Sequence, residues 1–213
     1  MEKQRIVVLG GSFNPPTKAH VAILEQTVQT LNATKGLFVP SSHAYVHRKA
    51  NRQHPNLLYS EQQRLELLDI ICHYHPTLRV LTHEYGDDGR GHTYESLCHI
   101  QKRYPNAEIW FILGDDKLRI LPRWHQGENL LREFHFAICC RNQNTIQQAQ
   151  KTLLAHPKTK KYIDQFQCIT IPPSPISSTQ ARACILDNNW DGLYNLCPTE
   201  IWHTLQTMKP IRL

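Results

Sequence analysis

Residues 6–20 of the chain read IVVLGGSFNPPTKAH. The first four residues are aliphatic, which is typical of a short buried strand. Two glycines follow directly, and a helical pattern begins near His20. Glycines let the backbone approach a ligand closely, and the start of a helix presents unsatisfied N–H groups to anions. The stretch therefore predicts a strand, a phosphate-binding loop and a helix, which together begin an α/β fold.

The rest of the chain continues this alternation of strands and helices. Five further short apolar runs are typical of buried strands, at residues 37–39, 79–81, 109–113, 136–138 and 169–171. Between the first two strands, apolar residues recur from Val21 to Leu31 at helical spacing, and Gly36 is expected to end that helix. Ser60 and Gln63 fit a capping box that opens a helix, and another helix is expected after Thr93.

This alternation favours a doubly wound, Rossmann-like α/β fold with a mostly parallel sheet and helices on both faces. Ligands are then expected where loops leave the carboxyl ends of the strands. The sequence contains no internal repeat and no Gly/Ser linker. We therefore expect a single domain over residues 1–213, in which residues 176–213 form a small C-terminal helical part.

The composition limits the kinds of partner. No apolar stretch reaches the roughly 20 residues that a membrane helix needs, and no export signal is visible, so we expect no membrane partner. The net charge of +6 favours anionic ligands. The basic residues are scattered except around Arg48, Lys49 and Arg52, so we expect a nucleotide rather than a nucleic acid.

Cysteine and histidine usage indicates a cytoplasmic protein without a metal site of its own. The seven cysteines form no C-x-x-C pair, which fits a reducing cytoplasm. The thirteen histidines form no H-E-x-x-H motif and no Cys/His cluster, so no metal ligand is assigned. The oligomeric state stays open, and a homo-oligomer is compatible with the sequence.

The loop after the first strand carries two residues suited to phosphate chemistry. His20 falls in the first turn of the helix, where it can donate to a phosphate oxygen, and Thr17 adds a hydroxyl group one turn earlier. Taken alone, a histidine near a helix start is more often an ordinary surface residue. The loop lacks the G-K-[ST] ending of a Walker motif and the G-x-G-x-x-G of dehydrogenases. It is another kind of phosphate loop.

A second candidate turn follows the last strand, where residues 176–182 read ISSTQAR. Ser177 and Gln180 fit a capping box, which would explain the serines structurally. Hydroxyl and N–H groups at a helix start also bind phosphate, and Arg182 can reach the same anion one turn later. Both interpretations remain open from the residues alone.

These two turns resemble the signatures of the nucleotidylyltransferase superfamily, G-[ST]-F-[DN]-P followed by [HT]-x-x-H, and I-S-S-T-x-x-R. Within it, the chain resembles the nicotinate/nicotinamide mononucleotide adenylyltransferases. Thr17 and Ala19 depart from the H-x-G-H that bacterial members using nicotinate mononucleotide usually show. The resemblance implies transfer of the adenylyl group of ATP, accompanied by Mg²⁺, to a pyridine mononucleotide. The products would be pyrophosphate and a dinucleotide for NAD biosynthesis.

The resemblance also implies the site residues. Residues implied to neutralise charge during transfer are Thr17, His20 and Arg182. Residues implied to bind ATP are Gly11, Ser12, Phe13, His20, Gly114, Asp116, Ile176, Ser177, Ser178, Thr179 and Arg182. Residues implied to bind the pyridine nucleotide are Ser12, Phe13, Arg48, Lys49, Thr93, Tyr94 and Trp124. Asp116 would contact the adenosine ribose, and Trp124 would stack on the pyridine ring.

Several alternatives remain at this point. The same signatures serve adenylyl or cytidylyl transfer to other phosphates, such as phosphopantetheine, and the departures at Thr17 and Ala19 allow a non-catalytic nucleotide-binding sensor. Nicotinate and nicotinamide mononucleotide are not distinguished. Residues 41–59 carry several basic side chains and no acid, which fits either a charged surface loop or a cationic flap over a phosphate.

Overall fold

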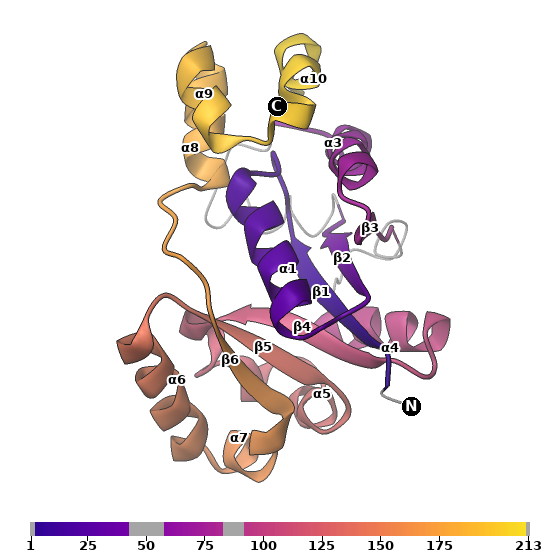
Figure 1. Cartoon of the computed structure of the whole chain (residues 1–213), viewed down its shortest axis with the longest axis vertical. Coiled ribbons are helices and arrows are strands. Elements are labelled where there is room, and N and C mark those ends of the chain that lie inside the picture. Colours follow the sequence, from indigo (N-terminus) through magenta and orange to yellow (C-terminus); the bar gives the residue numbers. More distant parts are fainter. Residues whose placement is uncertain (1–2, 43–57, 83–91, 212–213) are drawn as a thin grey trace. The chain divides into compact units, whose positions relative to one another are not determined.

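The computed structural model describes residues 3–42, 58–82 and 92–211 (Figure 1). The strands are β1 (Arg5–Gly11), β2 (Lys35–Pro40), β3 (Leu78–Val80), β4 (Glu108–Gly114), β5 (His135–Cys140) and β6 (Phe166–Thr170). Each of the six predicted apolar runs overlaps one of these strands. The last strand begins earlier than predicted, at Phe166, because its first residues alternate in burial and do not form an apolar run.

The helices follow the predicted alternation. They are α1 (Lys18–Thr30), α3 (Glu61–Tyr74), α4 (Thr93–Arg103), α5 (Gly127–Glu133), α6 (Gln143–Ala155), α7 (Pro157–Lys161), α8 (Ser178–Leu186), α9 (Trp190–Leu196) and α10 (Trp202–Thr207). The capping box of α3 is confirmed: Gln63 N–H donates to Ser60 Oγ at 3.2 Å, and Ser60 N–H donates to Gln63 Oε1 at 2.9 Å.

The prediction that Gly36 ends the first helix was wrong. Helix α1 already ends at Thr30, and Gly36 lies inside β2. The reversal is made by Asn32, whose φ of 48° lies in the left-handed region that asparagine tolerates better than most residues. A glycine was therefore not needed for the turn.

The strands form one sheet in the order β3-β2-β1-β4-β5-β6. Strands β1 and β4, β4 and β5, and β5 and β6 pair in parallel. The predicted α/β, Rossmann-like fold is confirmed. The strand order reverses at β1, and ligands of open α/β sheets bind outside the carboxyl ends of the strands at such a reversal. The carboxyl end of β1 leads into residues 12–17.

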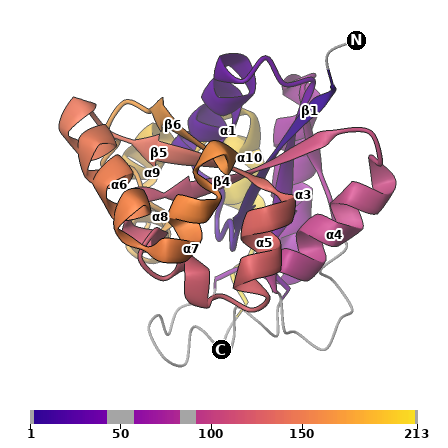
Figure 2. The same ribbon diagram turned by 90° about the horizontal axis from the view of Figure 1, so that it is seen from below.

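The described chain divides into two compact units. Unit 1 contains residues 1–9, 23–36 and 92–173, and unit 2 contains residues 10–22, 37–91 and 174–213. In unit 1, strands β4 and β5 supply an almost fully buried apolar core, with Ile109, Phe136 and Ile138 at most 1% exposed. Residues 23–30 of α1 lie on one face of these strands, and α4, α5 and α7 lie on the other (Figures 1 and 2). The prediction of helices on both faces holds for this unit.

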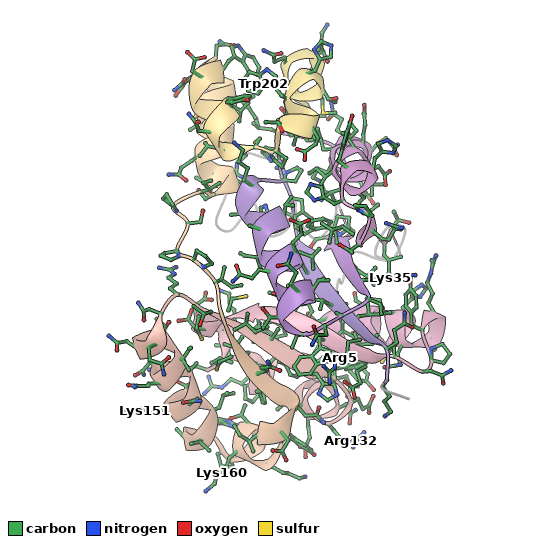
Figure 3. All side chains as sticks on the ribbon, in the orientation of Figure 1. Arg5, Lys35, Arg132, Lys151, Lys160 and Trp202 are labelled. Carbon is green, nitrogen blue, oxygen red and sulfur yellow. The ribbon has the colours of Figure 1, made fainter. Side chains whose placement is uncertain are left out.

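Unit 2 is built around α3 and the C-terminal helices. Leu67, Leu68 and Ile71 give α3 a fully buried apolar face. Between α9 and α10, the ring of Trp202 meets the rings of Trp190 and Tyr194 edge-on, at centroid distances of 6.3 and 5.2 Å (Figure 3). These ring contacts join α9 to α10 beside the buried side chains of Leu193 and Leu205.

All seven cysteines carry free thiols; Cys140 and Cys197 are buried, and the other five are half-buried. Burial raises the pKa of the Cys72, Cys139, Cys140 and Cys197 thiols to about 12. Within residues 3–42, 58–82 and 92–211, no helix is long and apolar enough to cross a bilayer.

Candidate active site

The loop after β1 is shaped by the packing of Phe13. Its ring is 1% exposed and meets the rings of Phe38 and His20 edge-on, at centroid distances of 5.3 and 5.1 Å. Phe13 has a φ of 47°, a strained value for a bulky residue. A Cβ on Gly11 would lie 3.1 Å from the ring of Phe13, so the missing side chain of Gly11 makes room for this ring.

Three side chains hold the carbonyl groups of the loop. The Ser12 carbonyl accepts a hydrogen bond from Arg64 Nη1 at 2.7 Å. The Asn14 carbonyl accepts from Arg182 Nη1 at 3.0 Å, and the Pro15 carbonyl accepts from Ser178 Oγ at 2.8 Å. The two signature turns, far apart in the sequence, are therefore in direct contact within unit 2.

The N–H side of the same loop is left open. Among the described residues of unit 2, none accepts a hydrogen bond from the backbone N–H of Ser12, Phe13 or Asn14. Consecutive backbone N–H groups with this freedom can bind an anion. In this loop the carbonyl groups of residues 12, 14 and 15 accept hydrogen bonds from side chains, whereas the N–H groups can donate to phosphate oxygens.

His20 is held in one orientation by Thr17. The backbone N–H of Thr17 donates to His20 Nδ1 at 3.0 Å, and the Thr17 hydroxyl lies 2.8 Å from the same nitrogen. Because Nδ1 accepts, the proton of the neutral ring is on Nε2. Burial lowers the pKa of His20 from 6.5 to about 4, so the ring is neutral at pH 7. His20 is therefore a neutral hydrogen-bond donor through Nε2.

Thr17 contacts His20 rather than open space. Its side chain is fully buried, and its hydroxyl group lies against the imidazole. The sequence had implied that Thr17 acts on the transferring phosphate together with His20. In this geometry the Thr17 hydroxyl can fix the ring and the tautomer of His20, and its part in the transfer stays a prediction.

Arg182 lies on the first turns of α8, one turn after Ser177. Ser177 is the N-cap of this helix, and its Oγ accepts from Gln180 N–H at 3.3 Å. The full capping box is not formed, because Gln180 Oε1 accepts from Ser177 Oγ at 3.0 Å instead of from the Ser177 backbone N–H. Arg182 Nη2 donates to Thr179 Oγ1 at 3.0 Å. Burial lowers the pKa of Arg182, which remains charged. A guanidinium group has five N–H donors, so Arg182 can hold protein oxygens and still bind an anion.

These residues provide several hydrogen-bond donors that can face an anion. Open backbone N–H groups, a neutral imidazole and a guanidinium group gather around one loop at the carboxyl end of β1. Fixed donors of this kind stabilise negative charge that develops on phosphate oxygens. The arrangement therefore suits phosphoryl or nucleotidyl transfer between two substrates, in which the protein positions and neutralises.

Unit 1 contains the residues that the resemblance assigns to the ribose. Gly114 ends β4, and a Cβ there would lie 2.5 Å from Asp116 Oδ1, so a side chain at position 114 would shift this exposed carboxylate. The Asp116 side chain is 65% exposed, and its Oδ2 lies 2.7 Å from Lys117 Nζ. The carboxylate is thus accessible to a ligand, and its assignment to the ribose stays a prediction.

The residues assigned to the pyridine are also in unit 1. The Tyr94 hydroxyl donates to Glu133 Oε2 at 3.0 Å, so this group already has a protein partner. The half-buried ring of Trp124 meets Phe111 edge-on at 6.4 Å, and the half-buried Thr93 is the first residue of α4. Their role in binding pyridine remains a prediction.

Two further predicted groups cannot be placed. Arg48 and Lys49, and with them most of residues 41–59, lie outside the described residues. Across the described ranges, no group of three or more His, Cys, Asp or Glu side chains is arranged to hold a metal ion.

Asn14 and Arg64 also contact the phosphate loop, and the sequence did not predict them as site residues. Asn14 is 3% exposed, and its Oδ1 accepts from Tyr59 N–H at 3.0 Å. Arg64 is fully buried although it carries a charge. The only signal for Arg64 is its place beside the apolar positions of a predicted helix, where a charged residue has to find partners.

Comparisons with known proteins agree with the motifs. Residues 8–184 match the cytidylyltransferase-like family, a range that includes both turns. A probable nicotinate-nucleotide adenylyltransferase of Listeria monocytogenes is 24% identical over 200 residues, which cover 94% of this chain and 93% of the relative. Another, of Herpetosiphon aurantiacus, is 32% identical over 135 residues, which cover 63% of this chain and 65% of the relative.

A solved structure shares the fold. The nicotinic acid mononucleotide adenylyltransferase of Plasmodium falciparum, complexed with NaAD, matches with a TM-score of 0.66 and 23% identity. The match covers 96% of this chain and 96% of that one. At this level of identity, the likeness supports the fold.

Proposed function

The chain belongs to the cytidylyltransferase-like family, and from that premise we propose that it transfers the adenylyl group of ATP to nicotinate mononucleotide. The reaction releases pyrophosphate and forms a pyridine dinucleotide for NAD biosynthesis. The observation that carries this proposal is the contact between the two signature turns, where Arg182 Nη1 donates to the Asn14 carbonyl. This contact gathers the donors for a polyphosphate around the carboxyl end of β1.

The choice of acceptor rests on the relatives. The Listeria and Herpetosiphon proteins are both named probable nicotinate-nucleotide adenylyltransferases, and the first aligns over nearly the whole of this chain. The Plasmodium enzyme of similar fold was solved with NaAD. Nicotinate mononucleotide is therefore favoured over the nicotinamide form and over phosphopantetheine.

The chemistry follows from charge. The anionic phosphate of the mononucleotide attacks the α-phosphorus of ATP, the bond to the β-phosphate oxygen breaks, and pyrophosphate leaves. His20 donates a hydrogen bond through Nε2 to an oxygen whose charge grows in the transition state. Arg182 and the N–H groups of residues 12–14 neutralise the polyphosphate. Aligning the two anions in this way removes much of the barrier without a protein nucleophile.

Magnesium is expected to arrive with ATP. When bound, it would neutralise charge on the phosphate oxygens. Magnesium is usually held by substrate phosphates and water with one or two carboxylates, so a dedicated protein cage is not needed.

A panel of acceptors tests the proposal. Purified protein receives ATP and magnesium with nicotinate mononucleotide, nicotinamide mononucleotide or phosphopantetheine, and pyrophosphate release is measured. We expect release with nicotinate mononucleotide at a kcat/KM at least about tenfold higher than with the others, the discrimination that one lost polar contact gives. A matched reaction with CTP identifies the nucleotide donor.

Each other outcome points to a different function. Release only with phosphopantetheine or only with CTP would replace the acceptor or the donor in the proposal. ATP binding without pyrophosphate release from any acceptor would indicate a nucleotide sensor and overturn the enzymatic proposal.

A further inference from the structure

A charged side chain lies fully buried behind the phosphate loop. Arg64 belongs to α3 and is 0% exposed, one turn before Leu67 and Leu68 on the buried face of the helix. Arginine is almost never fully buried unless its donors are used, because removing its charge from water is costly. The position therefore requires an explanation in terms of partners.

Two of the partners of Arg64 are backbone carbonyls that follow different strands. Its Nη1 donates to the Ser12 carbonyl at 2.7 Å and to the Ser41 carbonyl at 3.0 Å. Ser12 follows β1, and Ser41 follows β2. The backbone N–H of Ser41 in turn donates to the Gly11 carbonyl at 2.9 Å. One nitrogen of Arg64 thus links the residues that directly follow both strands.

The start of the same helix holds the loop at a second point. Tyr59 N–H, immediately before the N-cap of α3, donates to Asn14 Oδ1 at 3.0 Å. Helix α3 therefore fixes residues 12 and 14 from one side, while Arg182 and Ser178 hold the carbonyls of Asn14 and Pro15. All these bonds use carbonyl or side-chain oxygens, and none uses a backbone N–H of residues 12–14.

We propose that Arg64 is a positioning residue for nucleotidyl transfer, whose buried guanidinium holds the Ser12 carbonyl so that the N–H groups of residues 12–14 point toward the phosphates. This inference rests on the proposed function of the site. Arg64 itself does not touch the substrates. Its effect is to keep the loop in its ligand-binding shape before ATP arrives.

Both hydrogen bonds come from the same nitrogen of Arg64, and this predicts how different substitutions of Arg64 will behave. Since both carbonyls accept from Nη1, a lysine at this position can place one ammonium group near both oxygens, whereas an uncharged chain of similar length can reach neither as a donor. Arg64→Lys should therefore keep part of the function that Arg64→Met loses.

The experiment compares these variants with a control of equal burial. Leu68→Ala truncates a fully buried side chain of the same helix and removes no hydrogen bond to the loop. Thermal unfolding is measured first, and all assays are made at a temperature where each variant is folded. The readouts are kcat and KM for ATP with nicotinate mononucleotide, the Kd of ATP, and hydrogen exchange of a peptide covering residues 11–16 with ATP present, since the phosphates would then protect the N–H groups of residues 12–14.

In Arg64→Met we expect kcat per folded molecule to fall by about 10- to 100-fold, the effect of a loop displaced by up to about 1 Å. Hydrogen exchange of residues 11–16 should become faster. Arg64→Lys should recover part of both effects. Leu68→Ala should lower the unfolding temperature and leave kcat and loop exchange within about twofold of the unchanged protein.

A purely structural role predicts a different result. If Arg64→Met and Leu68→Ala lose stability alike and both keep kcat and loop exchange, the proposal is wrong. If the unchanged protein releases no pyrophosphate, the proposed function fails. Loop exchange and the Kd of ATP then still decide whether Arg64 shapes the loop.

Discussion

The phosphate loop of unit 2 differs in burial from the residues of unit 1 that are predicted to bind the ribose and the pyridine. Around the loop, Thr17 and Arg64 are fully buried, and each predicted catalytic side chain has at least one fixed hydrogen-bond partner. In unit 1, Asp116 is mostly exposed and Trp124 is half-buried. The difference teaches where rigidity is needed. Charge neutralisation depends on donors held in place before the substrate arrives, whereas recognition of a base or ring can use surface side chains.

The largest effect is expected from the central donor of the loop. His20→Ala should lower kcat by about 100-fold or more, because it removes a donor to charge that develops in the transition state. Steady-state pyrophosphate release measures this loss, and thermal unfolding checks the fold. Near-normal turnover in a folded His20→Ala variant would remove the histidine from the mechanism.

The second-largest loss of activity is expected from removing Arg182, the cation of the second signature turn. Arg182→Ala should lower kcat/KM for ATP by about 30- to 100-fold, since it deletes a charged donor and frees the Asn14 carbonyl that it holds. Arg182→Lys keeps the charge but not the paired geometry and serves as the control. An Arg182→Ala variant with unchanged ATP kinetics would contradict the phosphate assignment.

A smaller loss of activity is expected for Thr17, which contacts His20. Thr17→Val removes the hydroxyl beside His20 Nδ1 but keeps the backbone N–H that donates to it. We expect a decrease in kcat of about tenfold, which corresponds to one hydrogen bond of modest strength, with an unchanged KM for ATP. Thr17→Ser should restore most of the activity. Equal losses in the valine and serine variants would mean that packing, not the hydroxyl, matters.

In unit 1 we expect a substitution of Trp124 to change only the KM for the acceptor, nicotinate mononucleotide. Trp124→Leu should raise KM for nicotinate mononucleotide by about three- to tenfold, the value of one aromatic stack, and leave KM for ATP unchanged. Phe111→Leu removes the ring that Trp124 meets edge-on and tests whether packing alone explains the change. A rise in both KM values after Trp124→Leu would place this ring outside the pyridine site.

The smallest effect concerns pH. Because the pKa of His20 falls from 6.5 to about 4, its Nε2 donor is unchanged from pH 8 to about pH 5.5, and turnover should vary less than about twofold from this group. The unfolded chain takes up the proton first, so the contribution of His20 to stability is complete above pH 6.5. It is lost as the pH falls through about 4. An NMR titration of His20 with a midpoint near 6.5 would refute this prediction.

The sequence predicted the fold and the class of ligand better than the contacts between residues within the site. Short apolar runs identified all six strands, and the resemblance carried by residues 11–20 and 176–182 is confirmed by the family match. Local patterns could not reveal that Arg64 reaches Ser12, because that contact joins residues 52 positions apart. They also placed Gly36 at a helix end, because glycine is common there and the left-handed turn at Asn32 carries no equally strong signal.

The shielded thiols give the protein an intrinsic reporter of local opening. Alkylating reagents attack the thiolate, which is scarce at neutral pH while burial keeps the pKa of Cys72, Cys139, Cys140 and Cys197 at about 12. Two of these residues belong to unit 1 and two to unit 2. Mass spectrometry of labelled peptides can therefore time the exposure of each unit separately without adding a probe, and a bound nucleotide that slows labelling in only one of them reveals which unit it stabilises.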